Sequence, residues 1–118
     1  MTNYSLNLLE QSDVNQHSLC PDDLLYNANA LAGEVGEVCN QVKKIRMANI
    51  RPDWVQQNEN SLPSAEMFRE RAVDELGDVL FYLIRVAKDL GVTLDQIAEF
   101  QIEKLNQRSE KYKRIFLK

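Results

Sequence analysis

Apolar residues recur every three or four positions over two long stretches of the chain. In the first stretch they are Leu24, Ala28, Leu31, Val35, Val38, Val42 and Ile45. In the second they are Ala72, Leu76, Val79, Leu83, Val86 and Leu90. This spacing places apolar side chains on one face of an α-helix. The pattern therefore predicts two amphipathic helices, each with one buried face.

Several residues indicate where the helices begin and end. Pro21 and the two aspartates after it predict the start of the first helix, because proline is tolerated in a first turn and acids there complement the helix dipole. We expect the second helix over about 64–90, ended by Gly91 as a C-terminal cap. A third helix should begin at Thr93, which has capping-box spacing with Gln96.

Two segments lack this periodicity. Residues 1–20 are polar and weakly patterned, so we expect a lead-in arm, and 48–64 contain two prolines and predict a long loop. The run 79–84 is apolar nearly all round, which predicts cover from other helices or a second subunit. The sequence thus predicts one all-α domain over 1–118, an antiparallel helix bundle. We expect its four-helix core to be completed in a homo-oligomer, a homodimer or homotetramer.

The composition narrows the classes of function. A net charge of -4 does not suggest a protein that binds a nucleic-acid polymer. No apolar run approaches the length of a membrane span, and the N-terminus has no secretion-signal pattern. The two cysteines are too few for a disulfide framework. We therefore expect a soluble, cytoplasmic protein that binds neither nucleic-acid polymers nor membranes.

Four acids form a matched set on the two predicted helices. Glu34 and Glu37 are three residues apart, as are Glu75 and Asp78, so each pair shares a helix face. Each acid comes one residue before an apolar position, about 100° around the helix from it. Antiparallel packing keeps equal offsets on the same side of the helix pair. We therefore expect all four to line one edge of a common groove.

Four carboxylates this close repel one another, so basic side chains or a metal ion must compensate them. Neither helix places a base between its two acids. Oxygen ligands favour Mg²⁺ or Mn²⁺ over zinc or copper. The single histidine, His17, lies outside both helices, which argues against a di-iron site with Glu-x-x-His pairs. The alternative is that the acids form solvated helix faces without a metal.

Glycines stand beside these acids at positions 33, 36 and 77. A glycine inside a helix costs about 1 kcal/mol relative to alanine. Their presence indicates close backbone approach, either by another helix or by a ligand.

The segments 33–38 (Gly-Glu-Val-Gly-Glu-Val) and 74–80 (Asp-Glu-Leu-Gly-Asp-Val-Leu) resemble the MazG-type nucleoside triphosphate pyrophosphohydrolases. The hallmark of that family is Glu-x-x-Glu on one helix and Glu-x-x-Asp on the next. The resemblance extends over 17–45 and 71–108. It implies an all-α oligomer that hydrolyses a (deoxy)nucleoside triphosphate between the α and β phosphates, giving the monophosphate and pyrophosphate. It also implies that Mg²⁺ is bound by Glu34, Glu37, Glu75 and Asp78.

The resemblance extends to the roles of single residues. Glu34 or Glu37 would orient or deprotonate the attacking water. Phosphate contacts would come from the helix after Glu-x-x-Asp, where the matching residues are Lys104, Asn106 and Arg108, with Lys111 and Tyr112 as alternatives. His17 resembles a position that approaches the base in members of the family that hydrolyse dCTP. Trp54 in the long loop is a candidate to stack on the base, and Tyr26 is a candidate to line the groove. For each of the three a packing role is the alternative.

Two other functions remain open. One is a phosphoribosyl-ATP pyrophosphohydrolase, which has similar acids and a different substrate. The other is a non-catalytic helical interaction module, against which the intact set of four acids argues.

Overall fold

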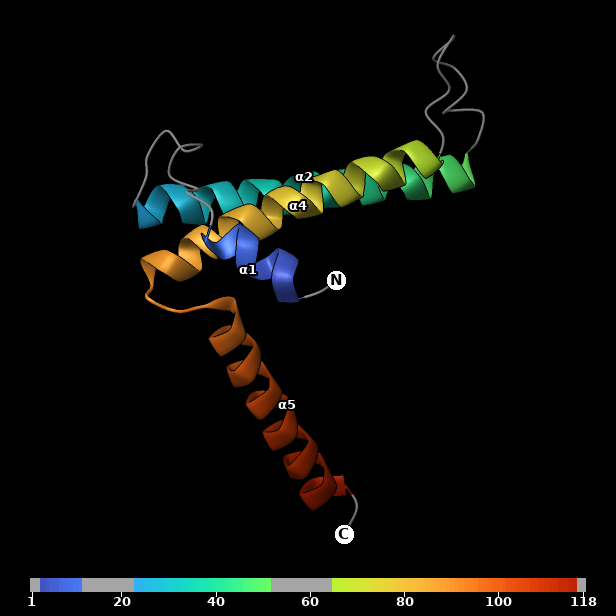
Figure 1. The fold of residues 1–118 in the computed structure, drawn as a ribbon. Coiled ribbons are helices and arrows are strands. Elements are labelled where there is room, and N and C mark those ends of the chain that lie inside the picture. The colour runs from blue at the N-terminus through green and yellow to red at the C-terminus, as the bar shows by residue number, and fades with distance from the viewer. Residues whose placement is uncertain (1–2, 12–22, 52–64, 117–118) are drawn as a thin grey trace.

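The computed structural model describes residues 3–11, 23–51 and 65–116. Within them it forms four helices, α1 (Asn3–Gln11), α2 (Leu24–Ile50), α4 (Ala65–Asp89) and α5 (Leu94–Phe116), and no strand. The two long helices α2 and α4 run antiparallel, and α5 points away from them (Figure 1). None of these helices is both long and apolar enough to cross a membrane. The all-α class predicted from the sequence is confirmed.

The ends of α2 differ slightly from the prediction. Asp23 is the N-cap, and its side-chain carboxylate accepts a hydrogen bond from the backbone N–H of Tyr26 at 3.0 Å. At the other end α2 continues to Ile50, so the expected start of the loop at Ala48 is wrong. The physical reason is packing, because Ala48 is buried against Phe68 of α4 and the helix continues through this contact.

The turn between α4 and α5 contains the helix-ending and helix-starting residues that the sequence predicted. Gly91 has a φ of +77°, and the N–H of Val92 donates to the carbonyl of Ala87 at 2.9 Å, which closes the end of α4. The hydroxyl of Thr93 accepts from the backbone N–H of Gln96 at 3.1 Å, and the Gln96 side chain accepts from the N–H of Thr93 at 3.0 Å. The capping box is confirmed, and it fixes where α5 begins.

The contact face between α2 and α4 lies one position away from the apolar stripe predicted on α2. The residues at its centre on α2 recur every seven positions and are buried or half-buried: Asn27, Glu34, Gln41 and Ala48. Val35 and Val42 of the predicted stripe are instead 45% and 52% exposed. Within a single chain the contact face therefore differs from the predicted stripe at these positions, because polar side chains take the central places and the valines lie beside them.

On α4 the contact face also departs from the predicted apolar stripe, but only at some positions. Its buried apolar residues are Phe68, Ala72, Ile84 and Ala87. Of the predicted stripe, Ala72 is buried, whereas Leu76 and Leu90 are 52% and 61% exposed. The helix pair thus retains apolar surface that α4 and α2 do not cover for each other.

A short helix forms inside the segment expected to be a lead-in arm. This helix, α1, reaches the turn between α4 and α5, where the Glu10 carboxylate accepts from the N–H of Leu94 at 3.4 Å. Leu6 and Leu9 are half-buried. A nine-residue helix is marginal alone, so tertiary contacts must stabilise α1.

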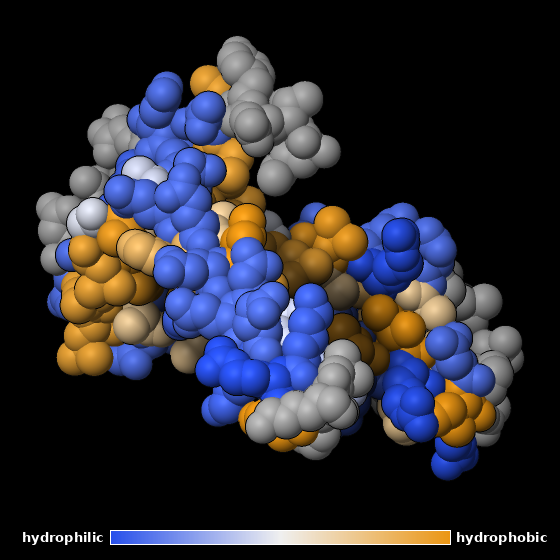
Figure 2. All heavy atoms as spheres, turned by 90° about the horizontal axis from the view of Figure 1, so that it is seen from below, coloured by the Kyte–Doolittle hydropathy of each residue, from blue (hydrophilic) through white to orange (hydrophobic). Residues whose placement is uncertain are grey.

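The last helix, α5, leaves most of its apolar side chains open. The side chains more than half exposed are Phe100, Ile102, Leu105, Tyr112 and Ile115. Figure 2 shows hydrophobic patches (orange) lying beside hydrophilic ones (blue) on the face of the molecule seen from below.

Candidate metal centre

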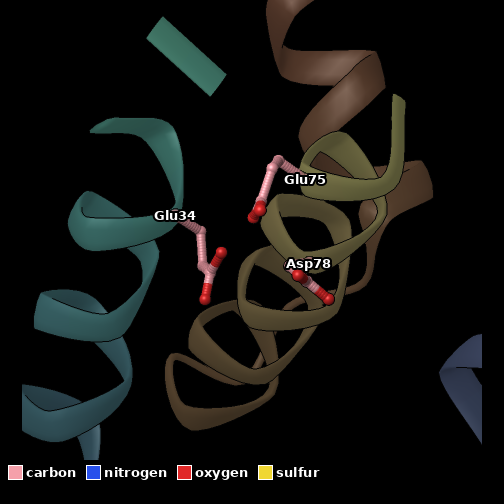
Figure 3. Close-up of side chains that lie close together, drawn as sticks. All are labelled: Glu34, Glu75 and Asp78. Atoms are coloured by element: carbon pink, nitrogen blue, oxygen red, sulfur yellow. The ribbon is translucent and has the colours of Figure 1, made fainter. Parts of the chain in front are cut away.

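Three of the four predicted acids meet between α2 and α4. Glu34, Glu75 and Asp78 each place one carboxylate oxygen within 4.8 Å of the others. Glu34 on α2 and Glu75 on α4 point toward one another across the helix pair, and Asp78 follows on the next turn of α4 (Figure 3). Glu34 and Glu75 are half-buried and Asp78 is exposed. We call these three residues the acidic cluster.

The fourth acid, Glu37, lies one turn further along α2 and is exposed. It does not share the 4.8 Å grouping of the acidic cluster. Its negative charge nevertheless contributes to raising the pKa of Glu34. Glu37 therefore lies at the margin of the cluster, within electrostatic range of it.

The electrostatics of the acidic cluster indicate uncompensated negative charge. Burial is the largest cause that raises the pKa of Glu34, followed by a hydrogen bond with Glu75 and then by the charges of Asp78, Glu75 and Glu37. A hydrogen bond between two carboxyl groups requires a proton on one of them. All these causes disfavour the ionised form of Glu34. The donor set is oxygen only, and this combination fits a hard divalent cation that would replace the shared proton.

Two tyrosines lie beside the acidic cluster. Tyr82 stands one turn after Asp78 on α4, and both it and Tyr26 of α2 are half-buried. Burial raises the pKa of Tyr82, as do the neighbouring groups Tyr26, Glu34 and Asp78, while the positive charge of Arg85 opposes them. Tyr26 was predicted from the sequence as a candidate site residue, whereas Tyr82 was not. Its spacing of four residues from Asp78 was the signal that could have found it.

The expected phosphate contacts Lys104, Asn106 and Arg108 are not brought to the acidic cluster within this chain. Lys104, Asn106 and Arg108 are exposed on α5, which points away from α2 and α4 (Figure 1). His17 and Trp54 lie outside the described residues. These five assignments therefore remain predictions.

The glycines beside the acids face open space in this chain. A Cβ atom built at Gly33, Gly36 or Gly77 would meet no atom within 4 Å. The described helices therefore do not make the close approach expected at these positions. The close approach by a helix or a ligand that the sequence predicted at these positions therefore stays a prediction.

Comparison with known proteins identifies the family. The model of the MazG nucleotide pyrophosphohydrolase domain matches residues 23–113, which include α2, α4 and most of α5. The Gene 37 protein of Mycobacterium phage L5 is 33% identical over 90 residues, covering 76% of this chain and 69% of that protein. No solved structure matches the chain. From the domain match and the paired acids, the chain belongs to the MazG nucleotide pyrophosphohydrolase family.

Proposed function

We propose that this protein hydrolyses a (deoxy)nucleoside triphosphate at the α–β phosphate bond in a magnesium-dependent reaction, giving the nucleoside monophosphate and pyrophosphate. The observation that carries the proposal is the acidic cluster, with carboxylate oxygens from two helices within 4.8 Å in a MazG domain.

The position of each of the four acids indicates its role. Glu34, Glu75 and Asp78 would hold the ion, which when bound neutralises phosphate charge and stabilises the pyrophosphate leaving group. Glu37 is exposed one turn away, where its carboxylate can orient a water molecule and accept its proton. Of the two catalytic candidates, Glu37 is the better base because it stands outside the three-carboxylate group.

The proposal includes a homo-oligomer. Val35 and Val42 of α2 and Val73 and Leu76 of α4 are between 45% and 56% exposed, on the helices that carry the acids. The radius of gyration is 19.1 Å, whereas a compact domain of this length has about 13–14 Å. A second copy would cover the apolar side chains and complete the four-helix core.

The proposed homo-oligomer also gives a role to the predicted phosphate contacts on α5. Lys104, Asn106 and Arg108 lie away from the acidic cluster of their own chain (Figure 1). We propose that they contact the phosphates bound in the site of another copy. Each site would then combine the acids of one chain with α5 of its neighbour.

The central test is an assay of ribo- and deoxynucleoside triphosphates with Mg²⁺. We expect monophosphate and pyrophosphate as products, lost in Glu37→Gln and in Asp78→Asn. Glu70→Gln is the matched control, because Glu70 is an exposed acid on α4. Diphosphate and phosphate as products would contradict the cleavage position. No turnover, together with no Mg²⁺ binding by calorimetry, would favour the non-catalytic module.

The shared site is tested by mixing two inactive variants, Asp78→Asn and the double variant Lys104→Ala/Arg108→Ala. A mixed oligomer contains one site with intact acids and an intact neighbouring α5. Recovery of activity on mixing supports the contribution from a second copy. A mixture that forms mixed oligomers by light scattering and remains inactive contradicts it.

A further inference from the structure

A polar network crosses the contact face between α2 and α4 near one end of the pair. Asn27 is fully buried and Arg85 is 2% exposed. The Arg85 Nε donates to the Asn27 side-chain oxygen at 3.1 Å, and the Asn27 side-chain nitrogen donates to a carboxylate oxygen of Asp89 at 2.8 Å. Asn27 therefore bridges a cation and an anion through its amide group. We call these three residues the polar network.

One donor of this network has no acceptor. The Nη1 of Arg85 is buried and makes no hydrogen bond in the part of the chain that the structure describes. An arginine side chain stays protonated in proteins, so this N–H group is always present. Buried donors are rarely left unpaired, because the loss of their hydrogen bonds to water is then uncompensated. The orphan Nη1 therefore indicates a place for an acceptor atom.

The surroundings of Arg85 indicate what kind of acceptor fits. Asp89 already balances the charge of Arg85 through the amide of Asn27. Arg85 therefore lacks an acceptor for its Nη1 hydrogen bond, and it does not lack a counter-charge. The guanidinium also lies over the ring of Phe81, 5.9 Å from its centroid, which helps to fix its plane. A neutral, directional acceptor such as a carbonyl oxygen suits this site better than a phosphate.

The position of the polar network relative to the acidic cluster matches the layout of a nucleotide. Arg85 follows Asp78 by seven residues, two helical turns or about 10.5 Å along α4. Asn27 precedes Glu34 by the same seven residues on α2. Tyr82 lies between Asp78 and Arg85 along α4, and Tyr26 directly precedes Asn27 on α2. Along α4 the acids, the Tyr82 ring and the polar network thus follow one another in the order of phosphates, stacked nucleoside and base edge.

We propose that the polar network forms the base-reading end of the substrate site, where Arg85 Nη1 donates to a carbonyl oxygen of the nucleobase. This inference rests on the proposed function. It gives the substrate class as nucleotides with a base carbonyl, in preference to adenine, which has none. Asn27 acts through Arg85 and is a positioning residue. Because Nη1 is covered, the base reaches it only when a neighbouring side chain turns aside.

The test compares inosine and adenosine triphosphates, whose bases carry a carbonyl and an amino group at C6 and differ accordingly in whether N1 bears a hydrogen. We expect the wild-type chain with Mg²⁺ to have the higher kcat/KM for inosine triphosphate. In Arg85→Lys, which keeps the charge and loses the planar donor fork, the ratio of the two kcat/KM values should fall about 10- to 100-fold. Asn27→Ser should shift it in the same direction by less. Arg69→Lys, an exposed arginine on α4, is the matched control and should leave the ratio unchanged.

The ratio is measured on one preparation, so a loss of folded protein cancels and cannot imitate the effect. If Arg85→Lys lowers both kcat/KM values equally, Arg85 has only a structural role and the inference is overturned. A wild-type ratio near one, with active enzyme, overturns it as well and leaves the proposed function standing. Absence of turnover by the wild-type chain overturns both.

Discussion

The two ends of the α2–α4 pair are built from different chemistry. At one end Ala48 and Phe68 pack together, and Ala72 is buried on the next turn of α4. Lys44 and Arg71 hold their charges over the ring of Phe68, at 5.8 and 5.7 Å from its centroid. At the other end the acidic cluster and the polar network occupy the same contact face. One end of the pair is therefore packed around apolar side chains, whereas at the other end acidic and polar groups lie beside the buried Ile84 and Ala87.

The apolar contact and the acidic cluster contribute to the free energy of folding with opposite signs. Burial of Ala48 and Phe68 stabilises the pair through the hydrophobic effect. Crowding of carboxylates opposes folding, because the pKa of Glu34 is raised and its ionised form is disfavoured in the folded chain. The apolar end thus offsets the destabilisation at the acidic cluster. Changes at the two ends should separate stability from activity.

The largest effect on stability is expected from Phe68→Ala at the apolar end. Phe68 is 5% exposed, and removing a buried phenylalanine side chain costs about 3–5 kcal/mol. Urea unfolding should show this loss, while turnover per folded molecule stays near that of the wild type. Leu25→Ala is the control, because Leu25 is 71% exposed and its truncation should change the free energy of unfolding little. Loss of turnover without loss of stability would contradict the division between the two ends.

The reverse pattern is expected from Asp78→Asn in the acidic cluster. On the proposed function Asp78 is one of the carboxylates that hold the ion, so its loss should lower kcat on the order of 100-fold or more, as loss of a charge-stabilising group does in other enzymes. The free energy of unfolding without metal should stay the same or rise, because one repulsive charge is removed. Turnover assays and urea unfolding on the same sample check both parts. If Asp78→Asn is as active as Glu70→Gln, Asp78 takes no part in the site.

A smaller effect is expected at the start of α5, outside both ends of the pair. Thr93→Ala removes the hydroxyl that accepts from the N–H of Gln96, and loss of such a cap costs about 1 kcal/mol. Hydrogen exchange should accelerate in the first turn of α5 and remain unchanged in α2. Equal acceleration in both helices would mean that α5 and the helix pair unfold as one unit.

The sequence predicts the helices well where local chemistry decides them. The second helix was expected over about 64–90 and is Ala65–Asp89. Gly91 and the capping box of Thr93 and Gln96 both appear as predicted, because each depends only on residues close in the chain. Helix α1 was not predicted, because a short polar helix depends on tertiary contacts that no local pattern reveals.

The orientation of the helices about their axes was harder to predict. An apolar stripe is the usual guide to a buried face, yet Val35 and Val42 are exposed while Asn27 and Gln41 are buried. The seven-residue spacing of Asn27, Glu34 and Gln41 was present in the sequence but was not recognised. Arg85 was missed for a related reason, because it directly follows the apolar run 79–84 and a long cation is seldom fully buried. Hydrophobicity alone cannot identify a contact face whose centre is polar.

The smallest expected effect is a dependence of stability on pH that arises from Glu34. Since the pKa of this carboxyl is raised in the folded chain, the folded state binds more protons than the unfolded state between the ordinary and the raised pKa. The stabilisation of the protonated form is complete below the ordinary pKa and is lost as the pH rises through the raised value. Without metal, Glu34→Gln should therefore be more stable than the wild type at pH 7, and the difference should narrow as the pH falls toward 4. The effect is small because Glu34 is only half-buried and solvent screens it.

We expect added Mg²⁺ to reverse the order of the two proteins. On the proposed function the ion would bind the ionised cluster of the folded wild type and stabilise it by mass action, while Glu34→Gln, with one ligand fewer, would gain less. Thermal unfolding of both proteins across this pH range, with and without Mg²⁺, measures the difference directly. Glu66→Gln changes an exposed acid in the first turn of α4 and keeps Glu34, so its difference in stability from the wild type should not depend on pH and should not change sign with Mg²⁺. A gap between Glu34→Gln and wild type that widens on acidification would mean that Glu34 is ionised and stabilising in the folded chain. The acidic cluster would then be compensated by something other than a metal ion.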